Sequence, residues 1–578
     1  MPGRPLVAGL SFALLLGALV TGDAHAAGPP GTGDLLDAPR HGQDAVTRLG
    51  AAGLRTAAAR NRTGAGDLAA QLREDPTLWV DRQGHLLVKD TGLVNPSAAD
   101  LNAPDADRPP SAPARLATAA QVSSAFSLHS RSGSDRVVFL DFDGHRVVGT
   151  GWNDEENGTD FTAEPFDTDR SPSTFSTSEL AVVQEVWARV SEDYAVFDVD
   201  VTTQDPGTAA IDRSGMSDTA FGTRAVITNT TKVFSSCHCG GVAYLDVFDY
   251  PYGHEQYQPA FVFQRGVGAE AKDIAEAVSH EVGHNLALHH DGNASTEYYE
   301  GQGAWAPIMG AAYGRPISQW SAGEYSGASN TEDDLALITS SGLNHLADDH
   351  GDTAASATVL GGPAVSVAGV ITTRSDVDRF AFTTVGGLLS LSVSPSAVGP
   401  DLDASLSLYD ADGTLLARDD PASAMVDAAT ATGLDAALTR TVAAGTYTVA
   451  VDGVGAGSPS GTGYSDFASI GRYTLSGTLP EGTPAVPTAP ADVRASVRSG
   501  RVTVRWTDRA TTESRYQMVR QRQYPNGTWS PSLLVSTRPA GATSASNSPW
   551  AAGRYRFLVR ATSPYGSSAW VMSNAVRR

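Results

Sequence analysis

Histidine and glutamate side chains within residues 278–292 stand at a spacing that can do metal-assisted chemistry. Residues four apart on a helix share one face, so the imidazoles of His280 and His284 can converge on a single ion. Glu281, one position along, points beside that ion, where its carboxylate can take a proton from a bound water. The pattern predicts a catalytic zinc site with Glu281 as general base.

A third zinc ligand must come from outside this helix face, because a catalytic zinc site uses three protein ligands and leaves one position open. His290 lies six residues after His284, and the neighbouring His289 is the alternative. By spacing we expect His290 to be the ligand. The chain must then turn sharply after the helix.

Together these positions resemble the H-E-x-x-H-x-x-G-x-x-H motif of the metzincins, a superfamily of zinc endopeptidases. The match falls on His280, Glu281, His284 and His290, and the chain departs from the motif at Ala287, where the family has Gly. If the backbone there is left-handed, a residue other than Gly costs on the order of 1 kcal/mol.

Two further features resemble the same superfamily. Met309 lies 19 residues past His290, within Ala-Pro-Ile-Met-Gly, and is similar to the turn whose Met forms an apolar floor below the zinc. Asp291, directly after the third histidine, resembles the reprolysin branch. The resemblance covers residues 123–347 and implies an α/β catalytic domain with a five-stranded mixed sheet and an active-site helix.

Hydrophobic periodicity places elements in this domain that agree with that implied fold. A Ser176 and Glu179 pair has the form of a capping box and opens a helix that runs to about residue 194. A last helix, over residues 331–343, is expected to begin at Asn330. The expected strands cover residues 137–140, 197–203, 225–228, 242–248 and 260–264. The zinc helix is expected to begin at about residue 270.

The strand at residues 242–245 maps onto the family's edge strand, which lines the cleft. An edge strand has unpaired N–H and C=O groups, so an extended peptide can pair with it as an added strand. This predicts a polypeptide substrate. The alternative is an edge strand that a loop covers.

With 578 residues, the chain is too long for a single core. Residues 1–26 are typical of a secretory signal: Arg4 is followed by an apolar run over 6–20, and Ala24-His25-Ala26 forms a small-residue cleavage site. The apolar run is shorter than the ~18 residues that a membrane span needs. We therefore expect a secreted, extracellular protein without membrane insertion.

Residues 27–122 are predicted to be a propeptide and linker, with a Pro- and Ala-rich last part. Some metzincins silence their zinc with a propeptide cysteine, but the only cysteines here are Cys237 and Cys239. Latency would then need a carboxylate such as Asp81, or steric blockage. The two cysteines are expected to form a disulfide around His238; reduced thiols and a second metal site are the alternatives.

The formal net charge of −23 and a sequence pI of about 4.9 argue against a nucleic-acid or anionic-membrane partner. We expect a monomer whose partners are polypeptide substrates.

Residues 348–480 alternate as short strands between Gly, Asp and Ser turns, which predicts a β-sandwich. They resemble the bacterial prepeptidase C-terminal domain. Four aspartates could hold calcium there, or could simply be turn residues. These are Asp349, Asp352, Asp376 and Asp378.

A Pro-rich joint precedes residues 481–578, where the strand patterns around Trp506 and Tyr555 resemble a fibronectin type III domain. The predicted protein is thus a multidomain, secreted zinc metalloendopeptidase made as a zymogen. The rival from another class is an adhesion or carbohydrate-binding exoprotein with a structural zinc site. An amidase of cell-wall peptides is a third possibility.

Overall fold

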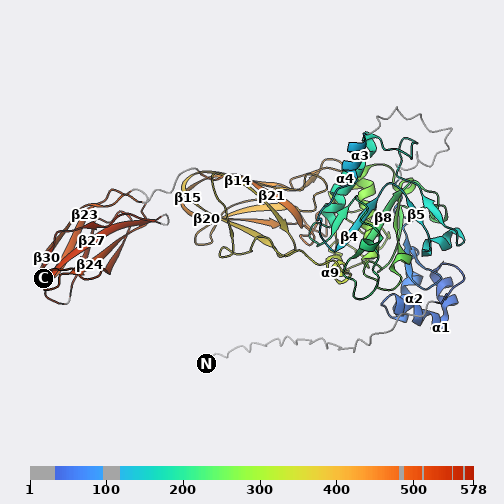
Figure 1. Ribbon diagram of the computed structural model, residues 1–578, viewed down its shortest axis with the longest axis horizontal. Helices are drawn as coiled ribbons and strands as arrows, with labels where there is room; N and C mark the ends of the chain where they lie inside the picture. The colour runs from blue at the N-terminus through green and yellow to red at the C-terminus, as the bar shows by residue number, and fades with distance from the viewer. Residues whose placement is uncertain (1–32, 96–117, 481–486, 511–512, 550, 564–565) are drawn as a thin grey trace, which may run out of the picture.

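The computed structural model describes residues 33–95, 118–480, 487–510, 513–549, 551–563 and 566–578. The predicted signal peptide, residues 1–26, lies outside these ranges. The protein is multidomain and rich in β-structure: an α/β unit is followed along the long axis by two β-rich units (Figure 1). None of the helices in the described ranges has the length and apolar character to cross a membrane.

An eight-stranded sheet, with the order β1-β2-β3-β9-β10-β8-β4-β7, forms the centre of the α/β unit. Its last five strands are the mixed sheet expected for residues 123–347, since β10, β8, β4 and β7 are parallel neighbours while β9 is antiparallel to β10. The bounds of these strands are β4 (Arg136–Asp141), β7 (Asp200–Thr202), β8 (Phe221–Thr228), β9 (Gly241–Tyr244) and β10 (Ala260–Phe263). A separate hairpin joins β5 (His145–Val147) to β6 (Phe161–Ala163).

Three strands from residues 33–95, called here the N-terminal segment, extend this sheet. The sequence did not predict this extension. They are β1 (Arg40–His41), β2 (Leu78–Val80) and β3 (Leu86–Lys89), and β3 lies antiparallel on β9 with Val88 opposite Ala243. The prediction of a free edge at 242–245 is therefore wrong for this state. The unpaired N–H and C=O groups of β9 are taken up by β3, because an open edge pairs with any extended segment that can reach it.

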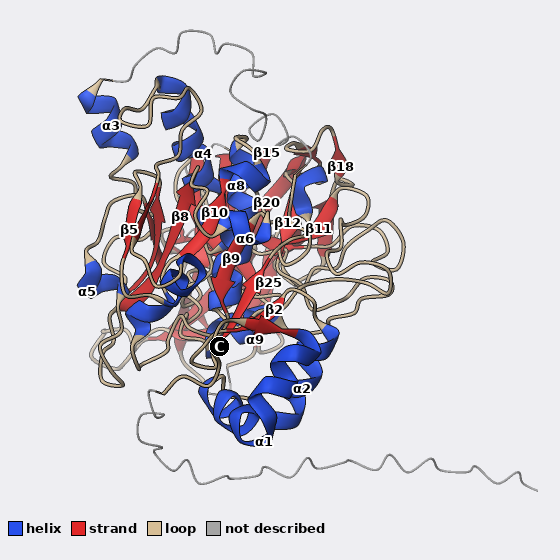
Figure 2. Ribbon diagram, turned by 90° about the vertical axis from the view of Figure 1, so that its right-hand side faces the viewer, coloured by secondary structure: helices blue, strands red, loops and turns tan. Residues whose placement is uncertain are grey.

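Helices α1 (Gly42–Arg60) and α2 (Ala65–Glu74) pack beside these added strands at one end of the sheet (Figure 2). Apolar residues of both helices share a small core with Leu78, Leu86 and Val88. Because Leu245 of the central domain joins the same core, the N-terminal segment is a folded unit docked on the domain rather than an extended tail.

Two long helices, α4 (Thr177–Asp193) and α8 (Ala271–Asn285), pack against each other. The predicted capping box at the start of α4 is present: the Glu179 amide donates to the Ser176 hydroxyl, and the Glu179 carboxylate accepts from the Ser176 amide. Tyr194 donates from its hydroxyl to the Ser279 carbonyl, 3.2 Å away, which ties the end of α4 to α8.

Shorter helices complete the α/β unit. The last of them, α9, is shorter than the predicted helix over 331–343, and Asp333 rather than Asn330 caps it. The Asn330 side chain instead contacts His289 and Glu332, a tertiary use that local propensity does not reveal. The bounds are α3 (Ala119–Ala125), α5 (Thr208–Ile211), α6 (Phe234–Cys237), α7 (Gln264–Val267) and α9 (Asp334–Ser340).

The first β-rich unit is built on one seven-stranded sheet, in which β15 and β20 pair along most of their length. Its buried residues belong to the same hydrophobic cluster as the core of the α/β unit, so the two units pack directly. The buried Glu192 of α4 faces Arg472 across this junction at 3.3 Å, and burial raises the pKa of Glu192 to about 7. The main strands are β14 (Ala364–Ile371), β15 (Val377–Pro395), β16 (Ala404–Asp410), β17 (Leu415–Asp419), β20 (Ala436–Gly453) and β21 (Gly471–Thr478).

In the last unit, two sheets face each other across a core that contains Trp506, Tyr516 and Tyr555. The predicted strands around Trp506 and Tyr555 are both present, as β23 and β27. The sheets are formed by β22 (Ala491–Arg498), β23 (Arg501–Thr507) and β26 (Ser544–Asn547), and by β24 (Arg515–Arg522), β25 (Leu533–Pro539) and β27 (Arg554–Ser563) with short strands at its edge.

Candidate metal centre

Helix α8 places His280 and His284 one turn apart, with both rings fully buried. Nδ1 of His280 lies 2.9 Å from the Ile308 carbonyl oxygen, and Nδ1 of His284 lies 2.8 Å from that of Leu288. A carbonyl only accepts, so each Nδ1 carries the proton and each Nε2 keeps a free lone pair. Burial also lowers the pKa of His280 to about 3, which keeps that imidazole neutral, as metal binding requires.

A sharp turn after α8 brings His290 back to these two rings. The Leu288 amide donates to the Gly283 carbonyl, and Ala287 has a left-handed backbone with φ +73°. The ring of His290 then lies 5.3 Å from that of His280 and 4.9 Å from that of His284, between centroids. His289 points away and pairs with Glu332 at 2.9 Å, so the geometry favours His290 as the third ligand.

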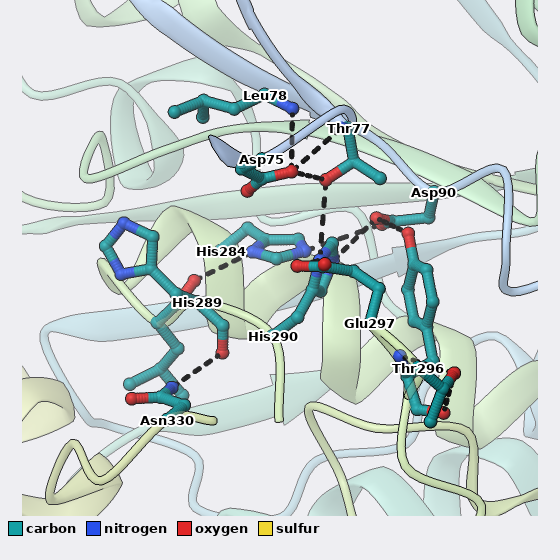
Figure 3. A network of polar contacts seen from close by, with 12 residues as sticks. Asp75, Thr77, Leu78, Asp90, His284, His289, His290, Thr296, Glu297 and Asn330 are labelled. Carbon is teal, nitrogen blue, oxygen red and sulfur yellow. Dashed lines mark hydrogen bonds and ion pairs between the residues drawn. The ribbon is translucent and has the colours of Figure 1, made fainter. Parts of the chain in front are cut away.

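The structure also brings in a carboxylate that the sequence did not predict, Asp90 (Figure 3). It is fully buried, and its oxygens lie 2.8 Å from Nε2 of His290, 3.4 Å from Nε2 of His284 and 3.7 Å from Nε2 of His280. Asp90 stands 200 residues before His290, so no local spacing signals this contact. Asp81, the carboxylate suggested by the sequence, instead contacts Tyr244 and His85.

These four side chains fit a metal ion. One ligand atom from each of Asp90, His280, His284 and His290 lies within 4.8 Å of the others. In the described part of the chain, Nε2 of His280, Nε2 of His284 and Oδ2 of Asp90 have no hydrogen-bond partner. Buried polar atoms without partners are costly, and a cation at their centre would satisfy all three.

The two kinds of donor also affect each other electrostatically. Burial raises the pKa of Asp90, but the neighbouring His284 and His290 outweigh it and hold that pKa well below its usual value. Burial lowers the pKa of His290, yet the Asp90 carboxylate outweighs burial and raises it to about 10. Asp90 therefore carries a negative charge at the centre of the site, and a cation that binds there would take the place of the His290 proton.

Glu281 lies next to this group without belonging to it. Its side chain is fully buried, and neither of its carboxylate oxygens has a hydrogen-bond partner among the described residues. Burial, together with the charge of Asp90, raises its pKa well above the usual value. A Cβ at Gly241 would come within 2.0 Å of Glu281 Oε1, so β9 needs glycine at this position to admit the carboxylate.

Met309 packs below α8, as the sequence predicted for an apolar floor. It is fully buried, and its sulfur lies 2.6 Å from where a Cβ of Gly283 would stand. The Asp291 amide donates to the Met309 carbonyl at 2.8 Å, and Ile308 accepts from His280. The backbone of this turn therefore holds the His280 ring directly and also holds the residue that follows His290.

Away from the centre, Cys237 and Cys239 form the predicted disulfide. Within the described ranges His238 joins no group that could hold a metal, so the alternative of a second site there has no support. The four aspartates suggested for calcium do cluster, together with Asp348, which the sequence analysis missed. The two groups are Asp348, Asp352 and Asp376, and Asp348, Asp349 and Asp378.

No family model matches this chain, and no curated protein does. Among solved structures it is similar to fibronectin type III-like domains. One, FN3tt, is 14% identical, covers 16% of this chain and 95% of its own, and has a TM-score of 0.13. A Fn3-like protein from Clostridium thermocellum is 19% identical over 16% of this chain and 94% of its own, with a TM-score of 0.13. The FN5 domain of Drosophila Lar is 18% identical over 16% and 96%, with a TM-score of 0.14.

The left-handed residue in the turn after α8 gives a stability prediction. Ala287→Gly should raise the free energy of unfolding by roughly 0.5–1 kcal/mol, because the relief of left-handed strain exceeds the extra entropy of glycine in the unfolded chain. Urea unfolding at saturating zinc, followed by tryptophan fluorescence, would measure it. Ala277→Gly, inside α8, is the control and should lower stability by about 1 kcal/mol. Equal losses in both variants would contradict a strained turn.

Proposed function

We propose that this protein is a secreted zinc endopeptidase of the metzincin type, in its reprolysin-like branch. The observation that carries the proposal is the convergence of three buried histidine Nε2 atoms beside a buried carboxylate, Glu281, that has no other partner in the described structure. The histidine donor set suits zinc. A structural site alone gives no reason to bury a free carboxylate beside it, since that burial costs several kcal/mol.

In this proposal each residue of the centre has one role. His280, His284 and His290 hold the zinc, and the carbonyls of Ile308 and Leu288 fix the orientation of two of the rings. Bound zinc would act as a Lewis acid toward the scissile carbonyl and make water more acidic. Glu281 takes the proton of the attacking water and delivers it to the leaving amine.

A polypeptide substrate is supported by the pairing of β9. Its outer edge accepts an antiparallel strand, which is how β3 is bound, with Leu87 opposite Tyr244 and Lys89 opposite Val242. An extended substrate could use the same N–H and C=O groups once β3 has left. Such a substrate would run past Gly241 and therefore past Glu281.

The proposal extends to the organisation of the whole chain. Residues 1–26 are the signal peptide, 27–122 the propeptide and linker, and 123–347 the catalytic domain. The left-handed turn at Ala287 and the Met309 floor support the metzincin assignment. Residues 348–480 and 481–578 are the prepeptidase C-terminal-like and fibronectin type III-like units.

The rival is an exoprotein with a structural zinc site, and one observation favours it. With Asp90 the centre has four protein ligands, and four ligands are typical of closed structural sites. The two functions differ in what happens once the N-terminal segment is removed: a peptidase keeps its zinc on three histidines, whereas a structural site loses a ligand it needs.

Glu281→Gln tests the peptidase directly. In protein freed of its N-terminal segment, the variant should bind one zinc like the wild type but hydrolyse casein roughly 10²–10⁴-fold more slowly, because the amide cannot accept the proton. Zinc content and casein turnover would be measured side by side, with a chelator added to the wild type to abolish turnover. Near-normal turnover in the variant would refute Glu281 as the base.

We also propose that the aspartate cluster of residues 348–378 binds calcium. Asp376 and Asp378 are buried, and within the described chain Oδ1 of each has no hydrogen-bond partner. Burial, followed by the charges of neighbouring aspartates, raises the pKa of Asp378 to about 8. Calcium prefers such hard carboxylate oxygens and would remove the repulsion between them.

Calcium should therefore stabilise the protein. At one hundred times the dissociation constant it would add about 2.7 kcal/mol, which raises the melting temperature of a unit of this size by several degrees. Differential scanning calorimetry with calcium and with EGTA would measure the shift. Asp376→Asn should abolish it, while Asp427→Asn, on an exposed turn, should retain it. An equal shift in both variants would place calcium elsewhere.

A further inference from the structure

We propose that residues 86–95 keep the protein latent, with Asp90 as the fourth metal ligand and β3 on the edge that substrate would use. This inference rests on the proposed function. The inference goes beyond that function because it assigns a regulatory role to Asp90 and to residues 86–95, which take no part in the hydrolysis.

The backbone fixes the position of Asp90. Its amide donates to the Gly241 carbonyl at 3.1 Å, and its carbonyl accepts from the Gly240 amide at 3.1 Å, which continues the ladder of β3 on β9. Because main-chain hydrogen bonds set this register, Asp90 is held at a strand position beside the histidines, and its carboxylate reaches His290 at 2.8 Å. The Tyr298 hydroxyl also donates to Asp90 Oδ1 at 3.0 Å.

The segment then crosses the site and is held on its far side. The Tyr313 hydroxyl donates to the Leu93 carbonyl at 3.0 Å, and the Leu93 side chain is 2% exposed. Gly92 passes so close to Tyr298 that a Cβ there would lie 2.2 Å from the ring. Beyond it, the Asn95 amide donates to the Gly266 carbonyl at 2.9 Å. Residues 90–95 therefore contact both sides of the site.

Two requirements of peptide hydrolysis are blocked by this arrangement. A catalytic zinc needs one open position, and Asp90 would take that position as the fourth ligand beside the three histidines. An extended substrate needs the free groups of β9, and β3 uses them. Since α1 and α2 share a core with β3, the segment is anchored by a folded unit and should not leave by fraying alone.

The test is made on full-length protein loaded with cobalt(II), whose visible spectrum reports its ligands. In the wild type, acetohydroxamate should leave the spectrum unchanged, because the fourth position is occupied. In Asp90→Asn the spectrum should differ from that of the wild type and should shift on adding hydroxamate. Zinc-loaded Asp90→Asn should also lose zinc to a chelator at least 10-fold faster, in line with the loss of a ligand contact.

Two further variants make the result specific. Asp81→Asn replaces a buried carboxylate that lies before residues 86–95 and outside the ligand group, and it should behave like the wild type. Gly92→Ala should let hydroxamate bind although the Asp90 carboxylate is still present in the chain, because the new methyl displaces the segment from Tyr298 and moves Asp90 with it. If circular dichroism shows that Asp90→Asn does not fold, Gly92→Ala still tests the inference.

The outcomes separate this inference from the function it rests on. Hydroxamate binding to full-length wild type, or identical spectra in wild type and Asp90→Asn, would overturn the role of Asp90 even if the processed protein hydrolyses casein. Cobalt that binds to none of the proteins would overturn the metal centre and this inference together. Latency that depends on Asp90 and Gly92 but not on Asp81 would establish it.

Discussion

Two hydrogen bonds from imidazole to backbone determine how the centre is built. When Nδ1 of His280 and of His284 donates to a carbonyl, each Nε2 must face the other way, toward the centre of the site. Those carbonyls belong to Ile308 and Leu288, so the turn after α8 and the turn that contains Met309 must both be formed. The geometry of the site thus depends on two turns outside helix α8.

Burial of polar atoms without partners destabilises this arrangement. Several nitrogen and oxygen atoms of the centre lie inside the protein without a hydrogen-bond partner among the described residues, and each of them lowers the stability of the fold. A bound cation removes that cost, and the Asp90 carboxylate balances part of its charge. The same burial excludes bulk water, which strengthens the electrostatic interactions of Glu281.

The strand β9 connects the chemistry to the rest of the fold. One of its edges pairs with β10 in the central sheet, and the other pairs with β3 of the N-terminal segment. Because Gly241 of β9 also contacts Glu281, whatever occupies the outer edge lies next to the proposed base. The sheet therefore places a bound strand and the metal ligands in a fixed relation.

The sequence by itself determined the local features of this protein. These are short-range patterns: the spacing of His280 and His284, the capping box at Ser176 and the alternation in the β-strands. They can be predicted because the geometry of a helix or a strand fixes which nearby positions share one face. The choice of His290 over His289 also followed from spacing. Tertiary structure decided the rest: Asp90 is one of 64 acidic residues and meets the histidines only because β3 pairs with β9. Contacts between residues about 200 positions apart leave no periodic trace in the chain, since they depend on how whole elements pack.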